Sequence, residues 1–462
     1  MSTEAKTVTK AEEPKMCTKK EQIGHAIGVL GHDAAYNLWN TWMMPFLTDI
    51  LMLPPLFIGG LTTVSRVFDA FTDVTMGVIA DRTRSKFGRF RPWVLRAGPI
   101  FCLLMALSFL KLPIGMTGMC IFAAVMYLLT GSIAFTAVDI PFWSLPAAMT
   151  SNTEERSSII GTTTTASNAM AGLIGLILPL GLGLLGEFEW TSYFTIAAIV
   201  AVFSATMYLI SFKTVKEHVV PNDTQKFSLR LAFKNIFTNQ PLLCVQLSNI
   251  ACLMAMTLRG FCNYYYCVYN LGAIQLASVM SLITLAGMVL GSICFIFGSK
   301  ILGKRNSMFA IAIIYTLSNA VLYFAGWSNL TIIFITAAIS NISMGAAIVC
   351  VNAMLADTIE YGEWKTGQRN EAMITSTRCF VTKCVGAASG LIIAVVIAVT
   401  GMVPQAAEQA PVVLNSFHFV FSMGSAIVMI LAVVPMFFYK LTEKRHAEIM
   451  EELAARKANR NK

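Results

Sequence analysis

Charged side chains within apolar segments are the most informative feature of this sequence. They interrupt stretches that are otherwise long and apolar, and they are Asp33, Asp69, Asp73, Asp139, Arg66, Arg378 and Lys383. Holding a charge inside a membrane span costs a protein several kcal/mol, so charges that are kept there commonly bind an ion or a substrate. These residues are therefore candidates for a functional site.

The spacing of the acidic residues favours a cation site. Asp69 and Asp73 are four residues apart, and Thr136 and Asp139 are three apart, so each pair occupies one face of a helix. Carboxylates that converge in a dry site cannot all stay charged and unpaired, so one takes a proton or a cation binds among them. Carboxylate and hydroxyl oxygens suit Na+ as ligands. The predicted cation ligands are Asp69, Thr72, Asp73, Thr136 and Asp139, with Asp69 and Asp73 holding the metal ion if Na+ is used.

The charges of the set nearly cancel. If all of them face one cavity, a single negative charge remains, and one bound cation would neutralise it. The structural alternative is that the acidic and basic residues pair only to hold helices together. Arg66 is the predicted charge partner of the acidic face, because it lies close to Asp69 and Asp73 on the same helix.

Aromatic and hydroxyl side chains near the carboxylates suit a sugar. A sugar offers hydroxyl groups to carboxylates and an apolar face to a ring, and Trp143 lies one helical turn after Asp139. Trp143 is alternatively an ordinary packing or interfacial residue. The threonines at 162–165 either line a polar cavity or donate to helix carbonyls four residues back. The tyrosines at 264–266 are expected in an interfacial aromatic belt, and Arg259 needs a partner that the sequence does not name.

The elements that carry these residues are predicted to be membrane-spanning helices. The chain has 462 residues, of which 56% are hydrophobic and 13% charged, whereas about 25% of the residues of a soluble protein are charged. Apolar runs of about 20 residues recur along the chain, long enough to cross a bilayer as helices and too uniformly apolar for barrel strands. The sequence predicts twelve spans, at residues 23–50, 57–80, 92–112, 117–147, 158–186, 190–212, 236–269, 274–299, 306–325, 330–357, 372–402 and 411–440.

The distribution of Lys and Arg predicts how the spans are oriented. Basic links alternate with links that contain almost no positive charge, Lys111 excepted. Both termini and the central loop are therefore predicted to face the cytoplasm, and the net charge of +9 reflects membrane topology rather than nucleic-acid binding. The predicted parts are a tail at 1–22, a six-helix bundle at 23–213, the central loop at 214–235, a second six-helix bundle at 236–440 and a tail at 441–462. Two bundles around a polar loop are typical of a secondary transporter.

Other classes of protein are disfavoured by the sequence. The 11 cysteines are scattered without metal-ligand spacing, there is no Walker A motif, and no nucleophile–base pair or metal cluster suggests an enzyme. Residues 1–22 lack the apolar region of an export signal. We expect a multi-pass inner-membrane protein, monomeric and without a cofactor, whose partners are the lipid bilayer, a sugar and a monovalent cation.

Four motifs, in order and at matching spans, resemble one transporter family. They run from Arg66 to Asp73 (RVFDAFTD), Asp81 to Trp93 (DRTRSKFGRFRPW), Asp139 to Leu145 (DIPFWSL) and Asp357 to Glu363 (DTIEYGE). The sequence resembles the glycoside–pentoside–hexuronide:cation symporter family of the major facilitator superfamily, whose best-known member is the melibiose carrier. The resemblance covers the whole chain. It implies an all-helical major facilitator fold, with twelve transmembrane helices in two bundles, and cation-coupled sugar transport.

The resemblance also implies roles for individual residues. Asp69 and Asp73 match the cation-site aspartates of the family, and Thr136 matches its threonine ligand. Asp139 matches an aspartate that the cation and sugar sites share. The other matches concern the sugar: Asp33 would bind its hydroxyl groups, Trp143 would lie beside its ring, and Lys383 would lie near both sites.

The chain departs from the melibiose carrier at several of these positions. Thr72 replaces an Asn, the sugar-binding arginine of span five falls near Thr164, and Arg378 replaces a Gln, so melibiose is not the expected substrate. Arg378 either pairs with an anionic sugar, such as a hexuronide or a sulfonated sugar, or restores the positive charge lost from span five for a neutral sugar. His32 stands beside Asp33 in place of a lysine, and either tunes the response to pH or only hydrogen-bonds a neighbour.

Together these observations lead to one functional prediction. The predicted substrate-binding residues are Asp33, His32, Asp139, Trp143, Thr164, Arg378 and Lys383. The charged links at 81–91 and 357–369 resemble gates that pair between bundles, with Asp81, Arg82, Glu360 and Glu363 as gating residues. We expect a symporter that imports a sugar or glycoside with Na+ or H+ by alternating access. The alternative is a carrier-like membrane sugar sensor without transport, a class that usually carries an added soluble domain.

Overall fold

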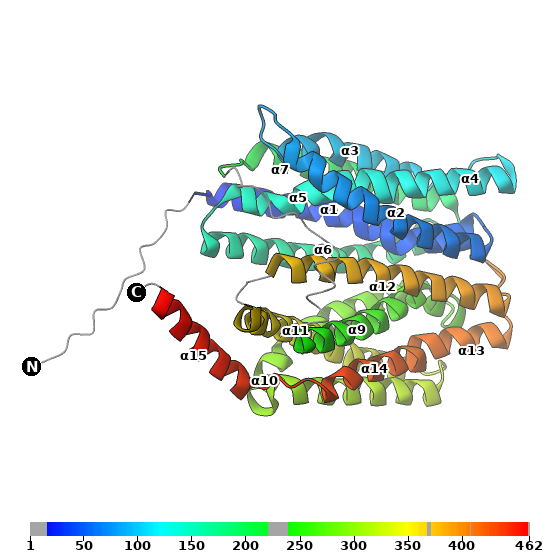
Figure 1. Cartoon of the computed structure of the whole chain (residues 1–462). Coiled ribbons are helices and arrows are strands. Elements are labelled where there is room, and N and C mark those ends of the chain that lie inside the picture. The colour runs from blue at the N-terminus through cyan, green and yellow to red at the C-terminus, as the bar shows by residue number, and fades with distance from the viewer. Residues whose placement is uncertain (1–15, 220–238, 367–370, 407, 461–462) are drawn as a thin grey trace, which may run out of the picture.

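The computed structural model describes residues 16–219, 239–366, 371–406 and 408–460, and within these ranges the chain is helical and contains no strand (Figure 1). Most of the predicted N-terminal tail and of the central loop predicted at 214–235 lies outside the described residues. The described helices form two groups, an N-terminal half that ends at residue 219 and a C-terminal half that begins at residue 239.

The N-terminal half begins with a capped helix. Thr18 and Glu21 form a capping box, in which each side chain satisfies a backbone N–H of the other, so α1 begins at Lys19. The elements of this half are α1 (Lys19–Pro45), the π-helical turn η1 (Phe46–Ile50), α2 (Pro55–Arg82), α3 (Arg91–Leu107), α4 (Gly115–Tyr127), the π-helical η2 (Leu128–Phe135), α5 (Thr136–Met149), α6 (Thr153–Leu185) and α7 (Trp190–Thr214).

The C-terminal half repeats features of the first. Its opening helix also ends in a five-residue π-helical turn, as α1 does. Its elements are α9 (Gln240–Tyr265), η3 (Tyr266–Asn270), α10 (Gln275–Ala325), α11 (Leu330–Thr366), α12 (Glu371–Thr400), α13 (Pro411–Phe419), the π-helical η4 (Val420–Gly424), α14 (Ser425–Phe437) and α15 (Glu443–Arg460). Helix α10 is broken at Gly303, whose φ of 74° and ψ of 164° are not helical, so it contains two of the predicted spans.

Each predicted span coincides with a helical segment, although several bounds differ. Eight helices within the described residues are long and apolar enough to cross a membrane, and α10 with its two predicted spans counts once among them. The number of crossings stays a prediction. Helix α11 continues to Thr366, so Glu360 and Glu363 lie on a helix rather than on the predicted link. The predicted C-terminal tail forms α15, which we did not expect; its Ile449 and Leu453 are one turn apart and both are buried.

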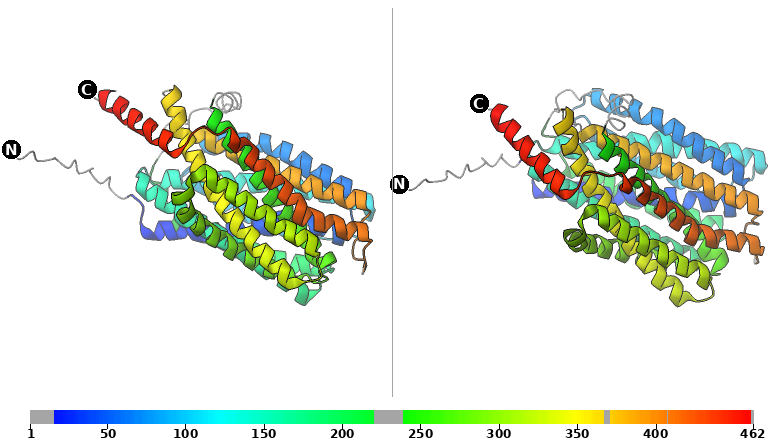
Figure 2. Two further views of the ribbon diagram at one scale, coloured as in Figure 1. Left: turned by 90° about the horizontal axis from the view of Figure 1, so that it is seen from below. Right: turned by 60° about the horizontal axis from the view of Figure 1, so that its bottom comes forward.

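The two halves lie side by side along their length (Figures 1 and 2). Helix α2 of the first half packs against α12 of the second, and α6 packs against α10. One buried apolar cluster fills the N-terminal half and continues into the C-terminal half through residues such as Tyr265 and Phe417, while a second cluster lies within the C-terminal half alone. Large apolar side chains such as Leu184, Ile301 and Phe324 are exposed, as expected for surfaces that face lipid.

We call the end of the bundles at which α1 begins and α15 leaves the terminal end, and the end at which α1 finishes the far end (Figure 1). At the far end the two halves are hydrogen-bonded to each other. The fully buried Asp49 accepts a bond from the Tyr264 hydroxyl at 2.8 Å, and its backbone carbonyl accepts from the Gln405 amide at 2.6 Å. The hydroxyl groups of Thr48 and Tyr265 are 2.9 Å apart. The interfacial location predicted for the tyrosines at 264–266 is therefore wrong, because all three are buried within protein.

At the terminal end, a carboxylate closes a loop in each half. The Glu217 carboxylate accepts bonds from the backbone N–H groups of Arg89, Phe90 and Arg91, at 2.8 to 2.9 Å. In the C-terminal half, Glu443 accepts from the backbone N–H of Lys304. Each loop has a glycine of positive φ just before the bonded N–H group, Gly88 and Gly303. These two carboxylate clips, at Glu217 and Glu443, are equivalent features of the two halves.

Candidate functional site

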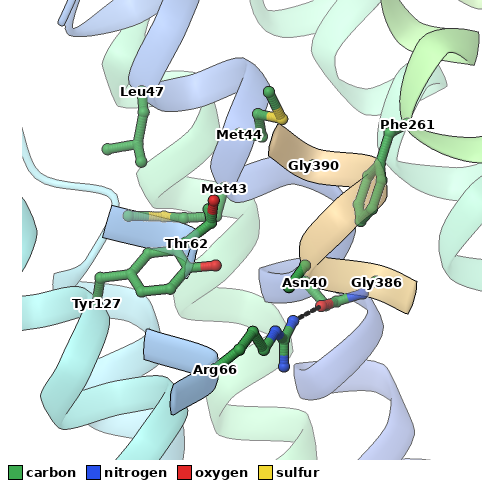
Figure 3. Close-up of a pocket in the computed structure, with 11 residues that line it drawn as sticks. Asn40, Met43, Met44, Leu47, Thr62, Arg66, Tyr127, Phe261, Gly386 and Gly390 are labelled. Atoms are coloured by element: carbon green, nitrogen blue, oxygen red, sulfur yellow. Dashed lines mark hydrogen bonds between the residues drawn. The ribbon is translucent and has the colours of Figure 1, made fainter. Parts of the chain in front are cut away.

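The acidic face of α2 is positioned as the spacing predicts. Asp69 lies one turn after Arg66, and its Oδ2 is 3.3 Å from the Arg66 guanidinium. The same guanidinium donates to the Asn40 amide oxygen of α1 at 3.3 Å (Figure 3). The other oxygen of Asp69 is buried and accepts no hydrogen bond from the described residues. Arg66 thus neutralises Asp69 from one side and leaves one carboxylate oxygen unsatisfied.

Asp73, one turn further along α2, is held from both halves of the molecule. Thr136, the first residue of α5, donates its hydroxyl to Asp73 Oδ1 at 3.2 Å. Lys383 of α12 donates to the other carboxylate oxygen, and the two side chains form an ion pair across the interface of the halves. The Lys383 ammonium also interacts electrostatically with Asp139 and Asp69. Lys383 is therefore paired with Asp73 and interacts electrostatically with the other two aspartates of the predicted cation site.

Asp139 has a second partner, on α1. Its Oδ1 is 3.0 Å from Nε2 of His32, and Nδ1 of His32 is 2.8 Å from the hydroxyl of Tyr208 on α7. His32 is buried, with 1% of its surface exposed, whereas Asp139 keeps 23% of its side-chain surface exposed. Of the two alternatives for His32, the structure shows the hydrogen bonds to neighbours.

The predicted sugar-binding residues Asp33 and Trp143 lie near this group. Asp33 is buried, its Oδ2 accepts no hydrogen bond from the described residues, and Ser167 of α6 interacts with its carboxylate. Trp143 is 41% exposed and meets the His32 ring edge-on, with 6.3 Å between centroids. The sugar-binding roles of Asp33 and Trp143 stay predictions, as does the alternative of a packing or interfacial Trp143.

Among the described residues, no hydrogen bond joins the other predicted ligands to an aspartate carboxylate. The Thr72 hydroxyl donates to the carbonyls of Phe68 and Asp69 within its own helix. Each threonine at 162–165 donates to the carbonyl four residues back, which is the second of the two predicted alternatives; Thr164 itself is exposed. Arg378 is half-buried and lies five residues before Lys383 on α12. The ligand roles of Thr72, Thr164 and Arg378 stay predictions.

The predicted gating residues lie at the terminal end. Asp81 accepts a bond at 2.7 Å from Arg89 in the same link, and Arg82 is exposed at the end of α2. Glu360 is bonded to His446 of α15, within the C-terminal half, and Glu363 follows one turn later on α11. The described contacts of Asp81 and Glu360 thus join parts of the same half, and pairing between the bundles stays a prediction.

Two narrow cavities meet at Arg66. The first is lined by Asp69, Thr136 and Lys383 together with Tyr36 and Phe135. The second lies between Met43 and Met44 of α1 and Gly386 and Gly390 of α12 (Figure 3). Within the described part of the chain, no group of three or more His, Cys, Asp or Glu side chains is arranged to hold a metal ion. The cation site predicted at Asp69, Thr72, Asp73, Thr136 and Asp139 stays a prediction.

Comparison with known proteins places the chain in a family. A family model described as MFS/sugar transport protein matches residues 24–443. The chain belongs to this MFS/sugar transport family. A relative named uncharacterized symporter YjmB, from Bacillus subtilis (strain 168), is 30% identical over 459 residues, which are 97% of this chain and 98% of the relative.

Two further members of the MFS/sugar transport family come from Escherichia coli (strain K12). A putative sulfoquinovose importer is 26% identical, over 95% of this chain and 94% of its own length. A putative 2,3-dihydroxypropane-1-sulfonate exporter is 28% identical, over 95% of this chain and 96% of its own length. The chain is thus a multi-pass membrane transporter of the sugar-transport type and not an enzyme.

Solved structures of low identity show the fold. The crystal structure of the nucleoside transporter NupG superimposes with a TM-score of 0.64 at 14% identity, covering 91% of this chain and 100% of that one. A bacterial homolog of the human lysosomal transporter Spinster, in an inward-facing and unoccupied conformation, gives the same score and identity and covers 91% of this chain. These neighbours and the helical architecture confirm the major facilitator fold.

Sequence reasoning missed some of the polar partners of this MFS/sugar transport protein. Nothing in the spacing of Asn40 or Tyr208 marks them as partners of Arg66 and His32. Arg259, whose partner was unnamed, donates to Asn319 at 2.6 Å and lies 4.3 Å from the ring centroid of Phe421. Each of these contacts joins two different helices, so only the fold reveals it.

Proposed function

We propose that the protein is a symporter that carries a sugar or glycoside into the cell together with Na+ or H+. The observation that carries the proposal is the position of Lys383, which reaches from the C-terminal half to the aspartates of the N-terminal half. Alternating access requires the two halves to move against each other around a shared site. An ion pair across that interface is a contact that a coupling ion can regulate.

The pair between Lys383 and Asp73 suggests how coupling works. The ammonium occupies a place that a small cation would take among the carboxylates. A proton on Asp73, or Na+ bound to Asp69, Asp73 and Thr136, would remove the charge that holds the lysine. The released Lys383, with Arg378 on the same helix, would then offer positive charge to a substrate. Ion binding thereby prepares the substrate site.

Relatives support an anionic sugar as the substrate. Their printed names include a putative sulfoquinovose importer, a putative 2,3-dihydroxypropane-1-sulfonate exporter and a glucuronide carrier protein homolog, and each name contains a compound with an acidic group. Arginine and lysine are the natural partners of sulfonate and carboxylate oxygens. We therefore propose a hexuronide or sulfonated sugar, with Asp33 and Trp143 contacting its hydroxyl groups and its apolar face.

We propose import, with the terminal end toward the cytoplasm. The basic links at that end support this orientation in a bacterial inner membrane, with both termini inside. The far end, where Asp49 and Tyr264 join the halves, would then face outward. The transporter would work as a monomer, because both halves of the site come from one chain.

Uptake by reconstituted vesicles tests the proposal. Purified protein in liposomes should accumulate sulfoquinovose or methyl β-D-glucuronide when an inward Na+ or H+ gradient is imposed, and not when both gradients are collapsed. Lys383→Ala should abolish uphill accumulation. Lys300→Ala should not affect it, because Lys300 is exposed and lies near the break of α10 at Gly303. Accumulation that is independent of both gradients, or indifference to Lys383→Ala, would refute the symport proposal. Preference for methyl β-D-galactoside would refute only the anionic substrate.

A further inference from the structure

His32 is placed where a substrate cannot reach it in this conformation. Its ring is stacked on Phe142, with 5.1 Å between centroids and 3° between planes, and on Phe135 at 5.4 Å. Both ring nitrogens are bonded to protein groups, Asp139 and Tyr208. A ring that stacks on two phenylalanines and is bonded at both nitrogens has no free polar atom in this state, and the substrate contact of His32 stays a prediction.

The direction of the two hydrogen bonds follows from chemistry. An ionised carboxylate only accepts hydrogen bonds, so Nε2 of His32 must carry a proton and donate it to Asp139. In a neutral imidazole the other nitrogen is then an acceptor, so the Tyr208 hydroxyl must be the donor to Nδ1. Tyr208 is fully buried on α7. Its hydroxyl can donate to Nδ1 and so supports the tautomer of His32 that donates to the carboxylate.

The hydrogen bonds that link Tyr208 to His32 and His32 to Asp139, which we call the relay, fix one oxygen of Asp139 and leave the other available. Asp139 Oδ1 is held by His32, while the side chain as a whole remains partly exposed. Asp69 and Asp73 form ion pairs with Arg66 and Lys383, whereas Asp139 is bonded to His32 and interacts with the Lys383 ammonium only electrostatically. A neutral His32 would orient Asp139 without cancelling its charge, and would leave this carboxylate negative and directed toward the shared site.

We propose that Tyr208 and His32 are positioning residues, which orient Asp139 for the ligands of the transport site without touching them. This inference rests on the symport function proposed above. It assigns Tyr208, a residue on a helix with none of the predicted site residues, a part in substrate affinity. It predicts that changes at Tyr208 act only through His32.

A double-mutant cycle measures that dependence. The probe is whichever of sulfoquinovose, methyl β-D-glucuronide or methyl β-D-galactoside the wild type takes up with saturation. Tyr208→Phe should raise KM about five- to tenfold with little change in maximal rate, as expected for the loss of one buried hydrogen bond. His32→Leu should raise KM further, and Tyr208→Phe added to it should then change KM less than about twofold.

Two controls separate positioning from general damage to the fold. His32→Gln keeps an N–H donor close to the place of Nε2 and should restore most of the affinity that His32→Leu loses. Tyr315→Phe removes another buried hydroxyl, from α10, and should leave KM unchanged. Additive effects of Tyr208→Phe and His32→Leu, or no rescue by glutamine, would overturn the inference.

Nitrogen NMR of protein labelled at histidine tests the relay without any substrate. The signal that His32→Gln removes identifies His32, and its shifts should show a neutral ring protonated at Nε2. Tyr208→Phe should shift the Nδ1 signal, because that nitrogen loses its donor. A wild-type ring protonated at Nδ1 would overturn the inference even if transport is normal. Failure of the wild type to take up any of the three probes, with the expected NMR signals, would instead refute the proposed function.

Discussion

At the far end, hydrogen bonds join one half of the molecule to the other, whereas the described contacts of the two carboxylate clips at the terminal end close each half on itself. Asp49 and Thr48 of the first half meet Tyr264 and Tyr265 of the second. Glu217 and Glu443, by contrast, each bind a loop of their own half. The two kinds of contact have different consequences for movement. Contacts between halves must break when the far end opens, and clips within a half can persist throughout.

The carboxylate clips therefore suit the role of making each half a rigid body. In the N-terminal half, Arg91 also donates to the Phe212 carbonyl at 2.6 Å, near the end of α7. In the C-terminal half, Arg305 donates to the Met436 carbonyl at 2.9 Å, near the end of α14. An arginine thus ties the clipped loop to the end of α7 in the first half and to the end of α14 in the second. We expect changes to the clips to lower stability, and changes to the far-end contacts to alter which end is open.

The largest effect on stability is expected at Glu217. Glu217→Ala leaves three backbone N–H groups without their acceptor, and we expect a loss of about 2–3 kcal/mol in unfolding free energy, moderated by water because the site is half-buried. The measurement is the thermal unfolding midpoint of purified protein in detergent. Glu217→Gln retains one acceptor oxygen and should lose less. An unchanged midpoint together with lost transport would show that this clip is a moving gate instead.

The next largest effect is expected at Tyr264, and on conformation rather than on stability. Tyr264→Phe removes the donor to the buried Asp49 carboxylate and should destabilise the closed far end by about 1.5–2 kcal/mol, which raises the open population more than tenfold. The buried Thr62, which lines the cavity of Figure 3, reports opening when it is replaced by Cys. Its labelling by an impermeant maleimide, above that of the parent chain, should become faster. Equal labelling rates would mean that the hydrogen bond does not hold the far end closed.

A smaller loss is expected at the glycine of the second clip. Gly303 has a φ and ψ that side chains rarely adopt, and a methyl group there would lie 3.0 Å from the Glu443 carboxylate. Gly303→Ala should cost about 1–2 kcal/mol in stability, measured by thermal unfolding. Gly298→Ala, on the same helix with open space around the added methyl group, is the matched control and should be neutral or slightly stabilising. Equal midpoints for the two variants would argue against a clip in the second half.

The comparison of the two ends also shows what sequence can predict. The charges of the site were visible because Asp69, Asp73 and Asp139 stand out in apolar spans, and helical spacing placed the first two on one face. Lys383 lies some 300 residues later; its charge in an apolar span marked it as a candidate, but only the family resemblance placed it near the two sites. Hydrophobic periodicity predicts helices but contains no information on which helices meet.

The far-end contacts were not predicted, for a related reason. Asp49 stands at the edge of a span, where a charge is unremarkable, and Tyr264 and Tyr265 have the composition of an interfacial belt. Their burial results from the packing of two halves that are separated by the central loop. The clip at Glu217 is equally invisible, since a glutamate in a polar link has no signal of its own. Motif reasoning thus locates residues whose chemistry is unusual for their segment, and misses ordinary residues that tertiary packing makes important.

The smallest expected effect is at Tyr265. Comparing it with Tyr264 shows whether a hydrogen bond to the Asp49 carboxylate closes the far end more strongly than a hydrogen bond to the Thr48 hydroxyl. The Thr48 hydroxyl that meets Tyr265 is also bonded to the carbonyls of Met44 and Pro45, so removing the tyrosine hydroxyl leaves Thr48 with partners. Tyr265→Phe should shift the balance between closed and open far ends by about 0.5 kcal/mol, against the larger shift from Tyr264→Phe. Labelling at the Thr62→Cys position measures both on one scale. If the two variants open the far end equally, the buried carboxylate of Asp49 has no special part in closing it, and the closure comes from apolar packing around both tyrosines.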